Sequence, residues 1–116
     1  MRMRCAWATL ALVAAPLAHA ADGERAEAGR KLYIGACQRC HGIALASNGI
    51  GLDLRTFPQH DKERFVRSVM NGVRAMPAWG DTLKSEQIDL IWAYIGSVNG
   101  WPRSSGQHSS SRTTEP

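Results

Sequence analysis

Cys37-Gln38-Arg39-Cys40-His41 is the stretch of this sequence that decides its fold. Two cysteines separated by two residues and followed at once by a histidine form the attachment signature of a c-type haem. Each thiol can add across one vinyl group of the porphyrin, and the two-residue gap lets both sulfurs reach the same edge. His41 then lies beneath the iron, where an imidazole supplies an axial bond. The motif therefore predicts one covalently bound haem c held by Cys37 and Cys40.

Other roles for this cysteine pair fit the surrounding sequence less well. The alternatives are a structural disulfide and a thioredoxin-like redox pair, but the redox pair needs a strand and a helix in a βαβ pattern, and no run of strands is predicted. A structural zinc site needs four ligands. Beyond the first 20 residues, the chain adds only the distant His60 and His108 to the motif's own Cys and His side chains.

The first 20 residues have the three parts of a secretory signal peptide. Met1-Arg2-Met3-Arg4 is a short basic start, Ala6 to Leu17 is apolar, and Ala18-His19-Ala20 has the small-x-small pattern of a cleavage site. The apolar stretch is too short to span a membrane, although a retained membrane or amphipathic helix is the alternative. We therefore expect cleavage after Ala20 and a soluble, periplasmic protein with no membrane anchor.

The remaining chain divides into one small domain and a tail. Residues 21–99 carry the motif and regular apolar patterns, whereas residues 100–116 are polar and serine-rich, which predicts a disordered tail. A domain of this size has a marginal core of side chains alone, so a buried haem would supply the missing apolar mass.

The charge of the chain gives no sign of a nucleic-acid partner. Removing Arg2 and Arg4 with the signal lowers the formal net charge from +4 to +2. Two ionised haem propionates would bring it to about zero. No run of lysine or arginine is present, so we predict no nucleic-acid binding.

Three segments have the periodicity of helices, and no segment alternates as a strand would. The first runs from about Ala26 to Gly35 and leads into the haem motif. The second runs from about Asp61 to Asn71, with Asp61 as its N-cap and Gly72 as its stop. The third runs from about Ser85 to Val98. The sequence thus predicts an all-α domain of three main helices around one covalently attached haem.

The second axial ligand can be sought among the methionines that remain after the signal is removed. Met70 lies on the apolar face of the second predicted helix, where methionine usually fills the core. Met76 precedes Pro77, which holds it in an extended loop from which its thioether can turn toward the iron. We therefore predict His41 and Met76 as the axial iron ligands. His60 is the rival, although a histidine just before a helix is more often a surface residue.

These features together resemble the class I c-type cytochromes. The resemblance rests on a first helix that leads into the haem motif, on a loop bearing Met76-Pro77 and on the run Ile91-Trp92-Ala93-Tyr94-Ile95. It covers nearly all of Ala26 to Val98, and the short run from the motif to Met76 is similar to that of compact bacterial monohaem members.

The resemblance also implies where the first and last helices meet. In this family the two helices cross at close range, with a glycine of the first against an aromatic residue of the last. Gly29 and Tyr94 occupy these two positions here. Tyr33 and Ile91 look like their flanking partners.

One segment departs from the family pattern. A Gly-Pro-x-Leu segment usually follows the motif, and the carbonyl of its proline accepts a hydrogen bond from the proximal histidine. This chain instead has Gly49-Ile50-Gly51-Leu52-Asp53-Leu54, without a proline. A backbone carbonyl near Gly49 to Gly51 is expected to take over.

Trp79 and Arg55 are the candidates for contacts with the haem propionates. An indole N–H needs a partner when it is buried, and Arg55 lies in a loop expected to line the haem edge. The alternatives are core packing for Trp79 and a solvated surface charge for Arg55.

A narrower resemblance points to partners. The segments Asp53–Pro58 and Ala75–Asp81 are similar to those of small cytochromes that take electrons from quinoprotein (pyrroloquinoline quinone) alcohol dehydrogenases, and of cytochrome domains fused to such enzymes. This implies a quinoprotein dehydrogenase as electron donor and an oxidase or another cytochrome as acceptor.

Filled axial positions leave no site for oxygen or peroxide on the iron, so the sequence predicts an electron-transfer protein and not an enzyme. We also expect it to be a monomer. Two alternatives remain. One is a structural haem subunit of a larger dehydrogenase or oxidase complex, and the other is a haem enzyme or gas sensor with a labile sixth ligand.

Overall fold

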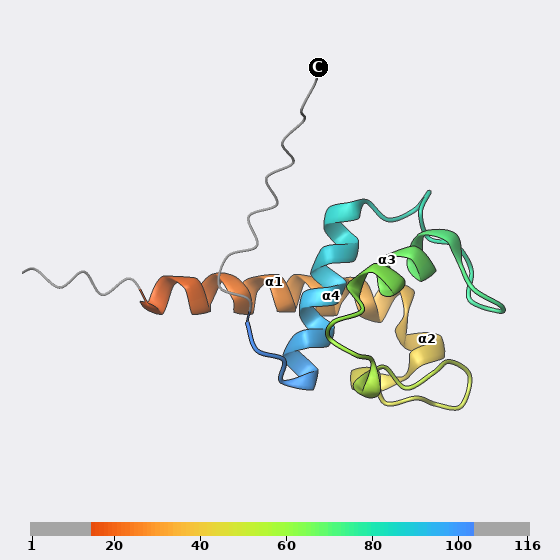
Figure 1. Cartoon of the computed structure of the whole chain (residues 1–116), viewed down its shortest axis with the longest axis horizontal. Helices are drawn as coiled ribbons and strands as arrows, with labels where there is room; N and C mark the ends of the chain where they lie inside the picture. Colours follow the sequence, from red (N-terminus) through yellow and green to blue (C-terminus); the bar gives the residue numbers. More distant parts are fainter. Residues whose placement is uncertain (1–14, 104–116) are drawn as a thin grey trace, which may run out of the picture.

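The computed structural model describes residues 15–103, and the regular secondary structure of this part is helical. Its elements in chain order are α1 (Ala15–Ala36), α2 (Gln38–His41), the 3-10 helices η1 (Ile43–Leu45) and η2 (Leu54–Thr56), α3 (Lys62–Asn71) and α4 (Ser85–Asn99) (Figure 1). The all-α prediction is confirmed. Of the predicted signal and tail, residues 1–14 and 104–116 lie outside the described part. Within residues 15–103 no helix combines the length and apolar composition that crossing a membrane requires.

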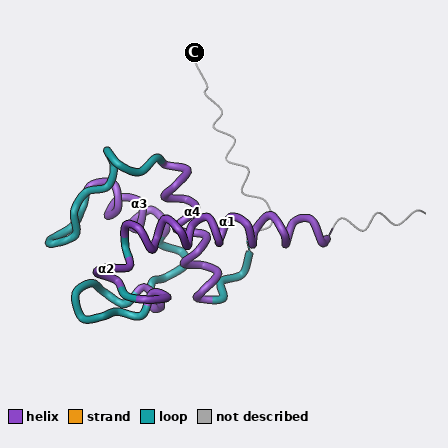
Figure 2. The backbone as a smooth tube through the Cα atoms, turned by 180° about the vertical axis from the view of Figure 1, so that it is seen from behind, coloured by secondary structure: helices purple, strands orange, loops and turns teal. Residues whose placement is uncertain are grey.

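α1 and α4 cross at Gly29, and this crossing is the centre of the fold (Figure 2). A Cβ atom added to Gly29 would lie 1.8 Å from the carbonyl oxygen of Leu90 and 3.0 Å from the Cβ of Tyr94. The rings of Tyr33 and Tyr94 lie 5.2 Å apart, and Tyr33 and Ile91 are fully buried. The crossing implied by the family resemblance is therefore present, with the four residues in the expected places.

α1 begins well before the segment that the sequence pattern marks as helical. The pattern starts at about Ala26, whereas the helix starts at Ala15. Residues 15–25 are rich in alanine, which has the highest helix propensity. This stretch is therefore helical although it has no apolar face that packs against the domain. The predicted cleavage point after Ala20 lies inside α1 and remains a prediction.

α3 and α4 have the predicted bounds to within one residue, but α3 begins without the expected side-chain cap. Asp61 occupies the N-cap position and makes no cap hydrogen bond. Its carboxylate instead accepts a hydrogen bond from Nε of Arg64 at 2.6 Å. Gly72, with φ +73°, ends α3 as predicted.

An aromatic cluster joins α3 to α4 and extends the packed domain beyond Asn99. The Trp92 ring lies 5.0 Å from that of Phe65 and 4.6 Å from that of Trp101. The N–H of Trp101 donates to the Gly96 carbonyl at 3.0 Å. The packed part of the chain therefore reaches Trp101 on α4, and the disorder expected for the tail stays a prediction.

Replacing Gly29 with alanine tests the crossing. The added methyl group meets the α4 backbone rather than a flexible side chain, so the helices must separate, at a cost of about 1–3 kcal/mol in the free energy of unfolding. Thermal or denaturant unfolding of the haem-loaded protein measures this loss. Gly35→Ala in the same helix is the matched control, because nothing lies within 4 Å of its added Cβ. Equal stability of the two variants would contradict the close crossing.

Candidate haem-binding site

The haem motif forms a single helical turn at the end of α1. The N–H groups of Cys40 and His41 both donate to the carbonyl of Cys37, at 3.1 and 2.9 Å. The N–H of Cys37 donates in turn to Tyr33 of α1 at 2.8 Å. Both cysteines are free, with Cys37 half-buried and Cys40 exposed. One turn thus presents two thiols and an imidazole close together, as attachment of a c-type haem requires.

The environment of Cys37 does not suit a thioredoxin-like redox pair. Burial raises the pKa of the Cys37 thiol to about 11, and the neighbouring Cys40 adds to the rise. A reactive redox cysteine has a lowered pKa instead. Residues 15–103 also lack the strand that precedes the helix in such a pair.

The orientation of His41 is fixed by a backbone carbonyl. Nδ1 of His41 lies 2.9 Å from the carbonyl oxygen of Leu52, so Nδ1–H donates there and Nε2 is left for a metal. The acceptor is therefore Leu52 and not a residue between Gly49 and Gly51, as the sequence suggests. The N–H of Gly51 donates to the Cys40 carbonyl at 2.7 Å, and this places the carbonyl of the next residue, Leu52, at the imidazole.

Gly51 lies directly against this imidazole. A Cβ added to Gly51 would be 2.8 Å from Nδ1 and 3.0 Å from Cε1 of His41. Only glycine lets the segment from residue 42 to residue 53, which we call the proximal loop, approach the ring so closely.

The second loop of the site joins α3 to α4, and it carries Met76. We call residues 72–84 the methionine loop, which lies at the same end of the molecule as α2 and the proximal loop (Figures 1 and 2). Val73 and Met76 exchange backbone hydrogen bonds of 2.9 and 3.1 Å. A Cβ on Gly72 would come within 2.7 Å of the Met76 carbonyl, so this turn needs glycine before it.

Met70 and His60, the other candidate ligands, lie in surroundings that differ from those of Met76. The Met70 methyl carbon lies 3.3 Å from the position of a Cβ at Gly80, against the returning methionine loop. Met70 and Met76 are both half-buried beside the core. His60 is exposed, ahead of α3. Met70 thus packs against the base of the loop that carries Met76.

The donor set fits a c-type haem. Two free thiols on one turn match the two thioether bonds, and the ring nitrogen of His41 that is not hydrogen-bonded to Leu52 can bind iron. The two loops also expose large apolar side chains, with 56% of Leu52 and 50% of Val73 accessible. An apolar porphyrin is a suitable partner for such side chains.

The two candidates for propionate contacts differ in their present partners. The Arg55 guanidinium pairs with Asp53 through Nη2 and Oδ2 at 2.5 Å, and this hydrogen bonding lowers the pKa of the carboxyl group to about 2. Trp79 is half-buried beside the core, and its indole N–H has no hydrogen-bond partner among residues 15–103. The Asp53 pair uses Nε and Nη2 of Arg55, so Nη1 of Arg55 and the indole N–H of Trp79 are the donors that could reach a propionate. Both contacts stay predictions.

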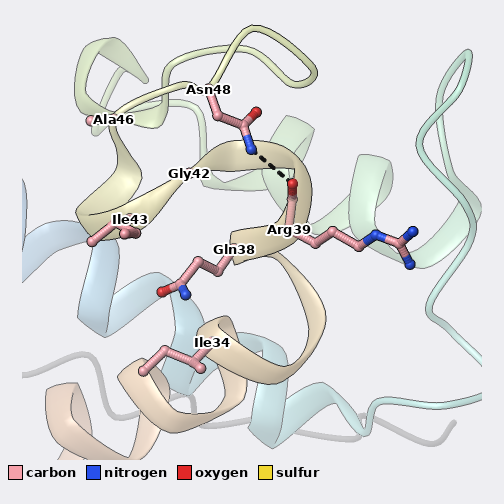
Figure 3. Close-up of a pocket in the computed structure, with 7 residues that line it drawn as sticks. All are labelled: Ile34, Gln38, Arg39, Gly42, Ile43, Ala46 and Asn48. Atoms are coloured by element: carbon pink, nitrogen blue, oxygen red, sulfur yellow. Dashed lines mark hydrogen bonds between the residues drawn. The ribbon is translucent and has the colours of Figure 1, made fainter.

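Two polar residues of the proximal loop were not singled out from the sequence. Nδ2 of Asn48 donates to the carbonyl of Arg39 at 2.8 Å (Figure 3), and the Ser47 hydroxyl donates to the Gly51 carbonyl. A Ser-Asn-Gly sequence is typical of turns, which predicts a bend here. It does not predict which backbone atoms these side chains reach.

Comparison with known proteins places this architecture in a family. The model of the family described as "Cytochrome C oxidase, cbb3-type, subunit III" matches residues 24–95, from α1 into α4. Cytochrome c6 of Bryopsis maxima is 33% identical over 87 residues, which are 65% of this chain and 96% of that protein. No solved structure gives a significant match.

Two further relatives differ in how much of their length is matched. The quinohemoprotein alcohol dehydrogenase ADH-IIG of Pseudomonas putida is 37% identical over 82 residues, 69% of this chain but only 11% of that protein. Cytochrome c550 of Pseudomonas aeruginosa is 36% identical over 80 residues, 63% of this chain and 55% of that protein. The helical fold, the haem motif and these matches together show that the chain belongs to the class I c-type cytochromes and binds haem c covalently.

Proposed function

We propose that this cytochrome transfers electrons through one haem held by Cys37 and Cys40, with His41 and Met76 as the axial ligands. The observation that carries this proposal is the hydrogen bond from His41 to Leu52, because it directs one ring nitrogen to the backbone and leaves the other for iron. When bound, the haem supplies a one-electron iron couple.

The chain's own residues set the properties of that couple. Donation from Nδ1–H to Leu52 makes the His41 imidazole a stronger electron donor to iron. The Met76 thioether is a soft ligand that favours ferrous iron, and it raises the potential. With both axial positions filled, the protein has no site at which a substrate could bind to the iron, so it carries electrons without bond chemistry.

A quinoprotein dehydrogenase in the periplasm is the electron donor that we propose, with an oxidase or another cytochrome as the acceptor. The resemblance of the Asp53–Pro58 and Ala75–Asp81 segments to dehydrogenase-linked cytochromes supports this donor, as does the similarity to a quinohemoprotein alcohol dehydrogenase. The exported protein would begin after Ala20 and act as a monomer.

A structural haem subunit of a larger complex is the second candidate. The matched part of ADH-IIG is 11% of that protein, so a domain of this kind occurs within a much longer chain. Gel filtration of the native protein separates the two: a free carrier elutes as a monomer, and a subunit elutes with its partners.

Met76→Ala tests the distal ligand. The far-red charge-transfer band that methionine gives with ferric haem should vanish while the haem stays attached, and the midpoint potential should fall. Met70→Ala is the matched control. It should keep the band and lower the free energy of unfolding by no more than about 5 kcal/mol, because it removes only packing. A band that survives in Met76→Ala, or that is lost in Met70→Ala instead, would overturn the ligand assignment.

The proposed donor is tested by rapid mixing of the ferric protein with a reduced quinoprotein dehydrogenase from the same organism. Arg39 is exposed within the haem motif, and Arg74 is exposed in the methionine loop. Replacing either with glutamine should slow reduction by about two- to fivefold, the effect of losing one charge at the rim of an interface. Because the net charge is small, added salt should slow it only modestly.

The control for this experiment is Arg25→Gln, which removes an exposed charge from the N-terminal half of α1 and should leave the rate unchanged. Reduction no faster than by an unrelated donor, and independent of Arg39 and Arg74, would contradict the proposed partner without affecting the general role in electron transfer.

A further inference from the structure

The side chain of Asn48 ties the proximal loop to the haem motif. Its Nδ2 donates to the carbonyl of Arg39, inside the motif, at 2.8 Å. Its Oδ1 accepts a hydrogen bond from the N–H of Ile50 at 3.1 Å. Figure 3 shows Asn48 above α2, with its amide directed at the Arg39 carbonyl. A single amide group therefore links the motif to the loop that follows it.

The hydrogen bond between Asn48 and Ile50 lies two residues before Leu52, whose carbonyl orients His41. The N–H of Gly51, the residue after Ile50, donates to the Cys40 carbonyl at 2.7 Å. The carbonyl of the next residue, Leu52, accepts from Nδ1 of His41. The contacts thus run in order from Asn48 to the axial histidine.

The sequence of this loop gives its backbone more conformational freedom than the family pattern would. The family's proline would restrict the backbone at this point, but here the segment contains Gly49 and Gly51 and no proline. Gly49 has φ +92°, a region that glycine enters readily. Ser47 adds local restraints, since its Oγ accepts from the Gly49 N–H at 3.1 Å and donates to the Gly51 carbonyl, but it does not reach the haem motif. Asn48 is the side chain of this segment that bonds to the motif.

We propose that Asn48 is a positioning residue that holds the Leu52 carbonyl on Nδ1 of His41 and thereby tunes the reduction potential of the haem iron. This inference rests on the proposed function, because it requires His41 to bind the iron. A strong hydrogen bond from Nδ1–H makes the imidazole a better donor and stabilises ferric iron. Loosening the Leu52 carbonyl should therefore raise the potential.

The test uses the haem-loaded protein with Asn48→Ala and two readouts. Redox titration should show a higher midpoint potential, so that the ferrous-to-ferric ratio at a fixed poise rises several-fold; a tenfold rise corresponds to 59 mV for a one-electron couple. Nuclear magnetic resonance of the ferrous protein should show at least a tenfold faster exchange of the His41 Nδ1 proton. The charge-transfer band of the methionine ligand should be unchanged.

A second variant tests the same proposal if Asn48→Ala fails to fold. Asn48→Ser retains a hydroxyl that can accept from the Ile50 N–H, as serine does in turns, but it is too short to reach the Arg39 carbonyl. It should shift both readouts in the same direction. Gln59→Ala is the matched control, because it removes another amide-to-backbone hydrogen bond, to Pro102 at 3.1 Å, far along the chain from His41. It should leave both readouts at their original values.

The outcomes separate this inference from the proposed function. If the unaltered protein shows His41 and Met76 bound to iron, and the Asn48 variants keep its potential and its proton exchange rate, Asn48 has no positioning role. If the unaltered protein lacks His41 ligation, the proposed function itself is wrong. A potential that moves equally in Gln59→Ala would show a general loss of stability and would also overturn the role of Asn48.

Discussion

The close approach of α1 to α4 at Gly29 is the constraint on which the rest of the structure depends. α1 leads into Cys37, so the crossing sets where the haem motif lies relative to α4. α4 in turn carries Trp92, which packs against Phe65 of α3, and α3 ends where the methionine loop begins. One backbone contact, possible only for glycine, therefore places both loops of the site.

The site itself is assembled mainly by backbone hydrogen bonds and carries few charged groups. The haem motif is one helical turn, the Leu52 carbonyl orients His41, and paired backbone groups hold Met76. Such a site would hold the proposed ligands, the neutral imidazole of His41 and the neutral thioether of Met76, in fixed positions. In the Asp53–Arg55 pair near it, 56% of the Arg55 side chain and 28% of the Asp53 side chain are exposed, and ion pairs in contact with water contribute little to stability.

The sequence predicts the parts of this structure that depend on local patterns and on motifs. It predicts the haem motif, the helix bounds near α3 and α4 and, through the family resemblance, the crossing at Gly29. It does not predict Leu52 as the acceptor for His41, the packing of Trp101 on Trp92, or the reach of Asn48 to Arg39. Each of these contacts depends on where a carbonyl or a ring lies in the folded chain. The spacing of residues in the sequence does not predict those positions.

Mass spectrometry of the denatured protein, purified from its source, tests the central claim most directly. The account predicts a chain that is heavier by the mass of one haem, with the added mass on the proteolytic peptide that contains Cys37 and Cys40, and retained in acidified organic solvent. An unmodified chain mass, with any haem extracted by that solvent, would contradict it.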